Sequence, residues 1–481
     1  MSEPKRLHPV AMILNILHSF RQWLVSLLPV VILSIGNGRL LFIGIFAVVL
    51  AVFYIGYSVV SWYRYTYWIE EDQLRIEHGV VIRKKRSISK HRIQSIDLTQ
   101  NIIHRIFGLT KVHIETAGTD LGIDAALHAV TMAEGKAIHD RLKYKKEQGS
   151  EDVFNDEKMP AEMYSSQKVD MTSLLVAGST SASFGVILGI LGLLVTELDS
   201  LIPDHYYSQA TNWLFSQAVQ TLILLAITAL IIMWFFGILT TVIQYWKFTI
   251  TRYEKELFMT RGLLEKKQST IPLKKIQAVG IKESLLRQPL GFCTIYVEVA
   301  SGALGKDGDT ATLLFPILRK KHALSFIKEL LPEFAFEQMN WGRPPSRALP
   351  YYLFRWIIIP LIACIVVAIY SLEWFYLPLA ALGLALCIAY SQFKSAGYEI
   401  QEKQLLIQSR ILNKDMVIMP HKRLQSMSKK QHILHKRHQL ANLETAILST
   451  ITGRRVALLE LEEKDTERII NWYSYRKQHL S

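Results

Sequence analysis

Basic side chains are the residues of this sequence best suited to binding chemistry, because lysines and arginines gather in three separate stretches. Their charges could hold anionic phospholipid headgroups or an acidic protein surface, and near an anionic leaflet each contributes roughly 1 kcal/mol of attraction. The alternative is a solvated strand face that only follows the preference for positive residues on the cytoplasmic side. The residues selected as lipid-binding or partner-binding are Arg83, Lys84, Lys85, Arg86, Lys90, Arg92, Lys266, Lys267, Lys274, Lys275, Lys422 and Arg423.

Two other motifs point towards metal or phosphate chemistry, but neither has the required spacing. His432, His435 and His438 would lie along one side of a helix, yet no carboxylate or cysteine joins them at a ligand spacing. Residues 302–308 are rich in glycine but do not follow the G-x-x-x-x-G-K-[ST] pattern of a phosphate loop. No nucleophile–base pair or carboxylate pair stands out either. We therefore expect no enzyme activity, no metal and no cofactor.

The basic stretches belong to an internal repeat, whose copies must position them. A pattern of basic, aliphatic, Gln and small residues occurs three times, as Arg92-Ile93-Gln94-Ser95, Lys275-Ile276-Gln277-Ala278 and Arg423-Leu424-Gln425-Ser426. In the first two copies the glutamine precedes a glycine, Gly108 or Gly291, by the same number of residues. A fold that is used three times repeats its framework residues, so we expect a structural role for the three glutamines.

The composition indicates apolar segments that alternate with polar domains. Half of the 481 residues are hydrophobic, the mean hydropathy is +0.20 and the net charge is +14. This chain is too apolar for an ordinary soluble enzyme and too charged for a bundle of membrane helices alone. The positive charge favours anionic partners, and a membrane-tethered chain is poorly placed to bind nucleic acid. The three cysteines lack CxxC spacing, so we expect them to be reduced.

Six apolar segments in three pairs are the expected membrane spans. They cover residues 23–35, 40–62, 173–195, 213–246, 351–370 and 374–391. About 20 helical residues cross a hydrocarbon core of about 30 Å, a length that all but the first segment meet or approach. Loops inside the pairs contain one basic residue, Arg39, whereas the outer flanks are rich in lysine and arginine. This asymmetry predicts a multi-pass plasma-membrane protein with both termini and all three polar regions in the cytoplasm.

Each polar region is expected to be a β-rich unit that closes with a helix. Short strand-like segments are separated by turn residues such as Gly79 and Gly262. In the first region, Thr131 and Glu134 form a capping box at the start of the closing helix. The closing helices of the other two regions carry apolar residues on one face: Ala323, Phe326, Ile327 and Leu330 in the second, and Ile469, Trp472 and Tyr473 in the third.

This organisation resembles the bacterial PH-like domain proteins of the YdbS/YdbT type. The Arg6-Leu7-His8-Pro9 start and the three copies are similar to the larger, YdbT-like member, and the resemblance covers nearly the whole chain. The third copy departs most, since Gln439 replaces the repeated glycine. The resemblance implies curved antiparallel sheets capped by a C-terminal helix at the inner face of the plasma membrane. It also implies a hetero-oligomer with a smaller, single-copy YdbS-like membrane protein, and it supplies no catalytic residues.

The expected fold is therefore a set of membrane α-helical hairpins plus cytoplasmic α+β units, in which a two-helix hairpin precedes each PH-like domain. The expected boundaries are 1–62 for the N-terminal segment and first hairpin, 63–148 for PH-like domain 1, 149–171 for a linker, 172–246 for the second hairpin, 247–337 for PH-like domain 2, 338–350 for a linker, 351–392 for the third hairpin and 393–481 for PH-like domain 3.

The predicted function is a non-enzymatic membrane scaffold for partner-protein assembly and anionic-lipid contact. The resemblance implies a role in envelope stress or antimicrobial resistance. A membrane transporter or channel component is the alternative class. Ionisable residues inside spans mark transport sites, and the expected spans contain only Arg355, which lies one turn from a cytoplasmic end.

Overall fold

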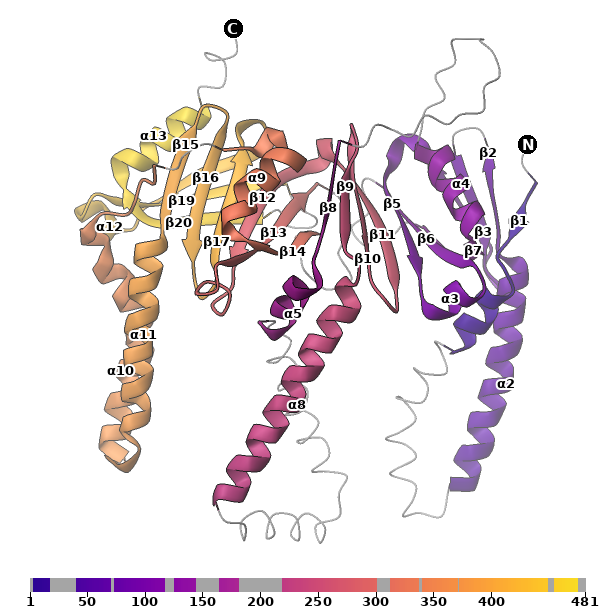
Figure 1. The fold of residues 1–481 in the computed structure, drawn as a ribbon, viewed down its shortest axis with the longest axis horizontal. Coiled ribbons are helices and arrows are strands. Elements are labelled where there is room, and N and C mark those ends of the chain that lie inside the picture. The colour runs from indigo at the N-terminus through magenta and orange to yellow at the C-terminus, as the bar shows by residue number, and fades with distance from the viewer. Residues whose placement is uncertain are drawn as a thin grey trace.

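The computed structural model describes residues 3–17, 40–70, 73–116, 125–143, 164–180, 219–300, 312–336, 340–370, 372–448 and 454–474. Within these ranges the chain forms three β-rich units in a row, and the long helices project from one side of them (Figure 1). The expected span 23–35, most of the span 173–195 and the glycine-rich segment 302–308 lie outside the described residues.

Three described helical segments are long and apolar enough to cross a membrane: Ile227–Tyr245, Ser346–Tyr370 and Leu372–Ser395. The first lies in α8 (Val219–Tyr245), and the other two contain α10 (Leu349–Tyr370) and α11 (Tyr376–Ser395). Helices α10 and α11 pack together as a hairpin, in which Trp356 Nε1 donates to Gln392 Oε1 at 2.8 Å. The third expected hairpin is therefore present.

The other two expected hairpins are represented by parts of their helices. Helix α2 (Leu40–Arg64) contains a shorter apolar stretch, Val48–Arg64. Helix α5 (Met171–Ser179) packs on α8 so closely that a Cβ at Gly178 would come within 2.7 Å of the Ile238 Cα. A glycine is thus required where these two helices meet.

Each unit consists of two three-stranded antiparallel meanders followed by a helix. Unit 1 contains β2 (Thr66–Glu70), β3 (Gln73–His78), β4 (Lys84–Ser89), β5 (Ile93–Gln100), β6 (Leu109–Thr116), β7 (Ala125–Thr131) and α4 (Met132–Lys143). Unit 2 contains β9 (Thr249–Arg252), β10 (Glu256–Arg261), β11 (Lys266–Pro272), β12 (Ile276–Glu283), β13 (Phe292–Val299), β14 (Thr312–Arg319) and α9 (Lys320–Leu330). Unit 3 contains β15 (Gly397–Gln401), β16 (Gln404–Arg410), β17 (Lys414–Pro420), β18 (Leu424–Lys430), β19 (Leu440–Ile447), β20 (Arg454–Glu462) and α13 (Glu463–Ser474).

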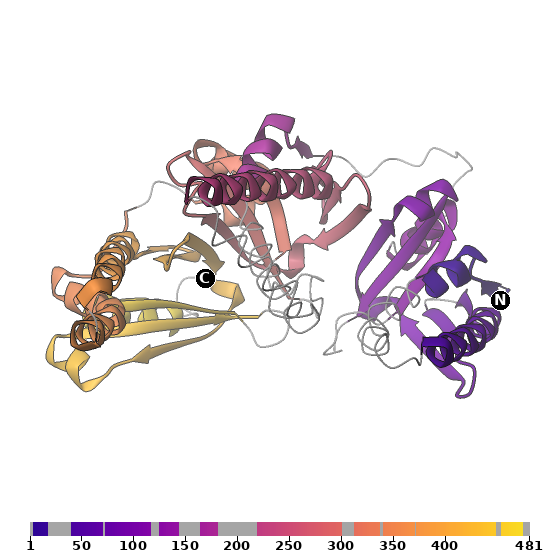
Figure 2. The same ribbon diagram turned by 90° about the horizontal axis from the view of Figure 1, so that it is seen from below.

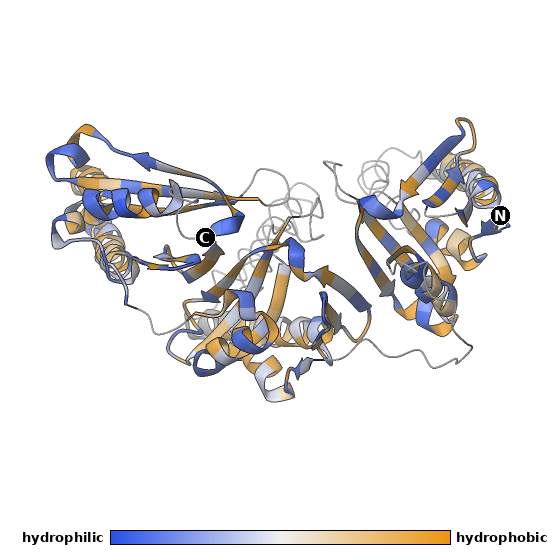
Figure 3. Cartoon of the chain, turned by 90° about the horizontal axis from the view of Figure 1, so that it is seen from above, coloured by the Kyte–Doolittle hydropathy of each residue, from blue (hydrophilic) through white to orange (hydrophobic). Residues whose placement is uncertain are grey.

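The closing helices follow the expected pattern. The Glu134 N–H donates to Thr131 Oγ1 at 3.3 Å, as expected for the N-terminal half of a capping box. The apolar faces of α9 and α13 pack into the cores of their units, where Ile327 and Ile469 are fully buried. Hydrophobic and hydrophilic residues alternate along the strands (Figure 3), so each sheet turns one face towards a core.

The segment that precedes each apolar region pairs with the first strand that follows the region. Strand β1 (Lys5–Arg6) pairs with β2, and β8 (Ser165–Lys168) pairs with β9. In unit 3 the equivalent contact is an isolated bridge between Gly342 and Tyr398. Both ends of each intervening segment are therefore tied to the same unit.

The sheets are not confined to single units, in contrast to the expectation of one sheet per domain. Strand β5 of unit 1 pairs with β11 of unit 2, and β12 of unit 2 pairs with β17 of unit 3. These pairings, named junction 1 and junction 2, create a seven-stranded and a six-stranded sheet. They join the units along an arc (Figure 2). Hydrophobic cores are also shared, because Leu406 and Ile418 of unit 3 belong to the core of unit 2.

The repeated glutamines mark a repeated irregularity of the sheet. The strand register shifts between Ile93 and Ser95, between Ile276 and Ala278, and between Leu424 and Ser426. Each shift leaves the glutamine as the extra residue of a β-bulge, a feature that bends a strand. The Gln277 side chain donates to the Lys275 carbonyl at 3.0 Å. The structural interpretation of the glutamines is confirmed.

The repeated glycine has a left-handed backbone, and its replacement in the third copy keeps that conformation. The φ angles are +65° at Gly108, +69° at Gly291 and +53° at Gln439. A residue with a Cβ pays about 1 kcal/mol for this region, whereas glycine enters it freely. Unit 3 therefore carries local strain that units 1 and 2 lack.

Replacing Gln439 with glycine is expected to stabilise unit 3 by up to about 1 kcal/mol. Amide hydrogen exchange in β19 of the full chain should slow by up to about fivefold. Gln439→Ala is the matched control, because it removes the same side chain but keeps the strain. Equal exchange rates in the two variants would show that the strain has no energetic consequence.

Candidate functional site

Junctions 1 and 2 have the same strand register. In junction 1, Leu98 lies opposite Gln268 and Thr99 lies opposite Lys267. In junction 2, Ile281 lies opposite Met416 and Lys282 lies opposite Asp415. Leu98 and Ile281 are each the fourth residue after the bulge glutamine of their own unit, and their partners each lie nine residues before the glutamine of the next unit. The units are therefore joined by one repeated rule of assembly.

Opposite charges meet across junction 2. The strand register sets Lys282 against Asp415 and Glu283 against Lys414. Beside the strands, Arg454 of unit 3 forms an ion pair with Glu298 of unit 2, which is fully buried. A buried carboxylate needs such a partner, so the pairing of units 2 and 3 depends on charge as well as on backbone hydrogen bonds.

The same guanidinium completes a polar cluster across the junction. Arg454 Nη2 lies 2.7 Å from Asp415 Oδ2 and 2.8 Å from the Tyr296 hydroxyl, which in turn donates to Asp415 Oδ1 at 2.7 Å. Burial alone would lower the pKa of Arg454, but Tyr296, Glu298 and Asp415 raise it above its usual range. Arg454 is therefore held in its charged form.

Junction 1 also holds a carboxylate from one unit against the next. Asp97 of β5 interacts with the Lys267 charge, the Ser269 side chain and the Thr270 backbone of unit 2. Burial raises the pKa of Asp97, and these partners oppose that rise. Both junctions thus combine strand pairing with a carboxylate that faces basic or hydrogen-bonding groups of the neighbouring unit.

The row of units ends in two strand edges that have no neighbour among the described residues. Strand β4 of unit 1 corresponds to β11 and β17, and β18 of unit 3 corresponds to β5 and β12. Residues are buried on the strand that pairs across a junction and exposed on the strand that does not. Gln277 and Ala278 of β12 are buried, whereas Gln425 and Ser426 of β18 are exposed. We call β4 and β18 the open edges. Such an edge is a template for adding a strand of another chain.

Both open edges carry lysines, and three of these form ion pairs within their own units: Lys85 with Glu77, Lys429 with Glu463 and Glu467, and Lys430 with Glu444. The register of the two junctions would set Lys429 of one copy against Lys85 of another, and Lys430 against Lys84. Like charges directly opposite one another destabilise strand pairing, so these edges oppose head-to-tail self-assembly. Their charge complements an acidic strand instead.

The comparisons with known proteins identify the repeated units. The bacterial PH domain family matches residues 24–146, 208–334 and 349–477, which is most of the chain. The chain belongs to this family. It is also 34% identical over 490 residues to the UPF0699 transmembrane protein YdbT of Bacillus subtilis (strain 168), with 99% of each sequence covered. No solved structure matches it.

The resemblance to YdbT-type proteins with three bacterial PH domains is confirmed. Each family match contains an apolar segment together with one β-rich unit, so units 1, 2 and 3 are the β-rich parts of three PH-domain repeats. The match to a named transmembrane protein and the three helical segments of spanning length agree that this chain is a transmembrane protein.

The twelve basic residues selected from the sequence do not form one site. Residues 83–86 lie in or just before the open edge β4, where all four are exposed. Lys266 and Lys267 lie on β11 and belong to junction 1. The other six lie at the 3₁₀ turns that link the two meanders of each PH domain: Lys90, Arg92, Lys274, Lys275, Lys422 and Arg423.

Two of the three histidines of the third copy have hydrogen-bond partners within the protein, and the buried Nδ1 of His435 has none in the described structure. His432 Nδ1 accepts from the Leu434 N–H at 3.4 Å, and His438 Nδ1 lies 2.8 Å from the Tyr351 hydroxyl. Burial, followed by the charges of neighbouring basic groups, lowers the pKa of His435. No group of three or more potential metal ligands occurs in the part of the chain that the structure describes.

His435 occupies a position that is used differently in each PH domain. In unit 1 the equivalent residue, His104, hydrogen-bonds the His128 carbonyl at 2.8 Å. In unit 2 it is Arg287, which donates to the equivalent carbonyl, that of Pro316, at 3.0 Å. Arg287 also donates to the Ala177 carbonyl of α5 at 3.1 Å. This arginine therefore ties α5 to its PH domain, a role that the sequence pattern did not indicate.

Proposed function

We propose that this protein is a non-enzymatic membrane scaffold that holds three PH domains at the cytoplasmic face and binds a further PH domain at an open edge. The observation that carries this proposal is the shared register of the two junctions. One rule joins unit 1 to unit 2 and unit 2 to unit 3. The strands that this rule would use next, β4 and β18, each have one edge without a neighbouring strand in the described structure.

The proposed partner is a smaller membrane protein with one PH domain, of the YdbS-like kind that the family resemblance implies. Such a partner would offer strands equivalent to β4 and β18, so that it could extend the row at either end. The basic open edges favour a partner strand with acidic residues, in the way that Asp415 lies opposite Lys282 in junction 2. Self-assembly is disfavoured by the lysines that would face one another.

The proposed topology is three hairpins with both termini in the cytoplasm. Strand β1 is bonded to β2, β8 to β9, and Gly342 to Tyr398. A chain that leaves a PH domain and returns to it must cross the membrane an even number of times. This argument supports six spans, and the distribution of basic residues supports a cytoplasmic position of the PH domains at the plasma membrane.

A bulky residue at the open edge of unit 3 tests the scaffold. Ser426 is exposed, but its equivalent in junction 2, Ala278, is fully buried and belongs to the core of unit 3. A tryptophan at Ser426 is therefore expected to leave the free protein intact and to obstruct a docked domain. Overpacking by about 1–3 kcal/mol weakens binding by roughly tenfold or more.

The measurement is quantitative mass spectrometry of proteins that co-purify with the full chain in a gentle detergent. A protein with a single PH domain should be recovered with the wild type and reduced at least about tenfold with Ser426→Trp. Lys403→Trp, in the exposed turn between β15 and β16, is the matched control and should retain it. Recovery of the chain only as a monomer, or equal recovery with Ser426→Trp, would contradict the proposal.

A further inference from the structure

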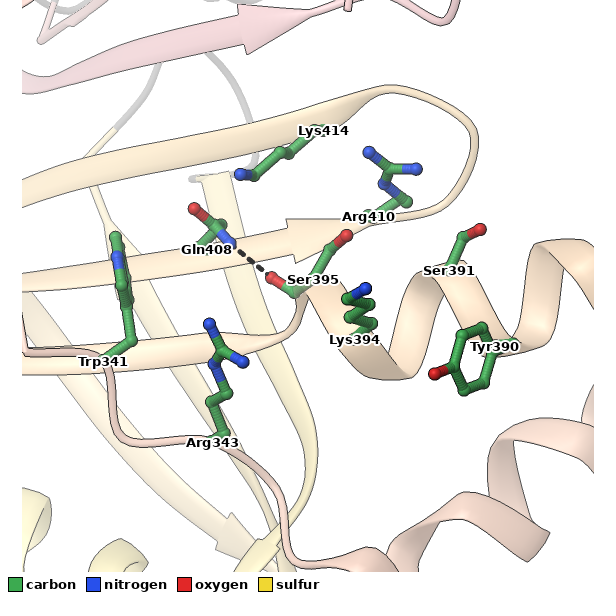
Figure 4. A pocket seen from close by; sticks show the side chains of 9 residues that line it. All are labelled: Trp341, Arg343, Tyr390, Ser391, Lys394, Ser395, Gln408, Arg410 and Lys414. Carbon is green, nitrogen blue, oxygen red and sulfur yellow. Dashed lines mark hydrogen bonds between the residues drawn. The ribbon is translucent and has the colours of Figure 1, made fainter.

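A basic cavity lies on unit 3 at the end of the last apolar helix, away from both open edges. Its volume is about 500 Å³. Four cations from four parts of the chain surround it: Arg343 precedes α10, Lys394 is in the last turn of α11, Arg410 ends β16 and Lys414 begins β17. Figure 4 shows these side chains around one space between the β16–β17 hairpin and α11. None of the described lining residues is acidic.

The positive charges are close enough to affect one another. Burial lowers the pKa of Lys414, and the charges of Lys320, Arg410 and Arg343 lower it further, while Glu283 opposes them. Glu283 is already in a 2.8 Å ion pair with Lys320. The Glu283 carboxylate is therefore shared between Lys414 and Lys320. An anion in the cavity would relieve the remaining repulsion among the cations.

One hydrogen-bond donor of the cavity is also unused. Arg410 Nη2 donates to Gln288 of unit 2, but the buried Arg410 Nε has no partner in the described structure. Buried N–H groups are rarely left without an acceptor. Gln408 meanwhile donates to the Ser395 carbonyl at 2.6 Å and holds the end of α11 against β16 (Figure 4). These hydrogen bonds hold the elements that carry the cations of the cavity in fixed positions.

The position of the cavity indicates where its ligand comes from. The apolar segment Leu372–Ser395 is long enough to span the membrane, and its last residues, including Lys394, line the cavity. Tyr390, one turn earlier, is exposed. Aromatic and basic residues at a span end lie at the level of the lipid headgroups. A lipid headgroup could therefore enter the cavity while its acyl chains stay in the bilayer.

We propose that this cavity binds the phosphate groups of an anionic phospholipid, with Arg343 and Arg410 as bidentate donors and Lys394 and Lys414 as point charges. Arginine matches phosphate geometry with two parallel hydrogen bonds, and each cation near the leaflet adds attraction. Four cations around one cavity favour a headgroup with two phosphates over one with a single negative charge. This site is separate from the open edges, so its occupancy does not depend on the proposed scaffold function.

The test uses the full chain, stripped of lipid in detergent and examined by native mass spectrometry. Cardiolipin, a phospholipid with two phosphates, should bind at least about tenfold more tightly than phosphatidylcholine. Arg343→Gln/Lys394→Gln should weaken cardiolipin binding at least about tenfold, and Arg410→Gln/Lys414→Gln should do the same. The first pair is exposed, so its loss does not disturb folding at junction 2.

The matched control is Lys422→Gln/Arg423→Gln, which removes one lysine and one arginine from a turn of the same unit. This variant should bind cardiolipin like the wild type. Equal loss in the control and the cavity variants would overturn the proposal, and so would equal binding of phosphatidylcholine. Inorganic phosphate that competes at the same concentration as the lipid would also overturn it, because the site would then serve a soluble anion.

Discussion

Replacing Arg454 with methionine is expected to separate units 2 and 3, at a cost of about 3–5 kcal/mol to junction 2. The guanidinium is the group that neutralises both Glu298 of unit 2 and Asp415 of unit 3. Methionine fills similar space but carries no charge. It would leave Glu298, which is fully buried, beside a second carboxylate with no cation between them.

The measurement is hydrogen exchange of the amides of β12 and β17 in the full chain, since these strands pair across junction 2. Exchange should accelerate more than about a hundredfold, the factor that corresponds to about 3 kcal/mol. Unit 1 and the strands of junction 1, β5 and β11, should keep their own exchange rates, because junction 1 does not contain Arg454.

Arg455→Met is the matched control for this prediction. Arg455 is the next residue of β20, its side chain is 71% exposed, and it pairs with Glu444 at 3.3 Å. An exposed pair contributes at most about 1 kcal/mol, so exchange should change less than about fivefold. Adding Glu298→Gln and Asp415→Asn to Arg454→Met should recover part of the loss. Equal exchange in the two single variants would show that the charges do not hold the junction.

The repeat made much of each PH domain predictable from the sequence. Three copies of one pattern indicated the number of units, and turn residues such as Gly79 and Gly262 indicated that each unit is built from short strands. The repeated glutamines and glycines were found because identical local geometry favours the same residue, in all three copies for the glutamine and in two of three for the glycine. Local rules of this kind depend only on neighbours in the chain.

The junctions were not predictable by the same means. Alternation shows which face of a strand is buried, but it does not show which strand lies beside its edge. Lys266 and Lys267 were selected as part of a basic surface, and they lie opposite Gln100 and Thr99 in junction 1. Their partners come from a different repeat, so no spacing within one copy indicated the contact.

The basic cavity was missed for a related reason. Its cations come from a linker, a membrane helix and two strand ends, and only the fold brings these elements together. None of Arg343, Lys394, Arg410 and Lys414 is among the twelve basic residues that were selected from the sequence. A cluster built from single residues of separate elements leaves no local pattern.

Arg355, the one charge of the expected spans, shows how tertiary structure changes the meaning of a residue. From the sequence it is a cation near a helix end that could extend to the headgroups. In the structure Arg355 Nη2 donates to Glu460 of β20, which is 1% exposed. Tyr352, one turn earlier, donates to the Leu459 carbonyl at 2.9 Å. The start of α10 is therefore docked on unit 3.

Replacing Arg355 with leucine is expected to weaken this docking by about 2–3 kcal/mol, because the buried Glu460 loses its charged partner. Burial raises the pKa of Glu460, and Arg355 and Tyr352 oppose that rise. A carboxyl group whose pKa is raised in the folded state favours folding in its neutral form. Stability of the variant should therefore be regained at acidic pH and lost as the pH rises through the raised pKa of Glu460.

The pH-dependent stability of the variant can be measured by hydrogen exchange of the β20 amides between pH 5 and pH 8. The rates are corrected for the intrinsic pH dependence of exchange. Exchange in Arg355→Leu should exceed that of the wild type by about thirtyfold or more at the alkaline end and by much less at the acidic end. Adding Glu460→Gln should remove the pH dependence, because the side chain keeps its shape but cannot ionise. A pH dependence that persists in the double variant would mean that another group controls the docking of α10.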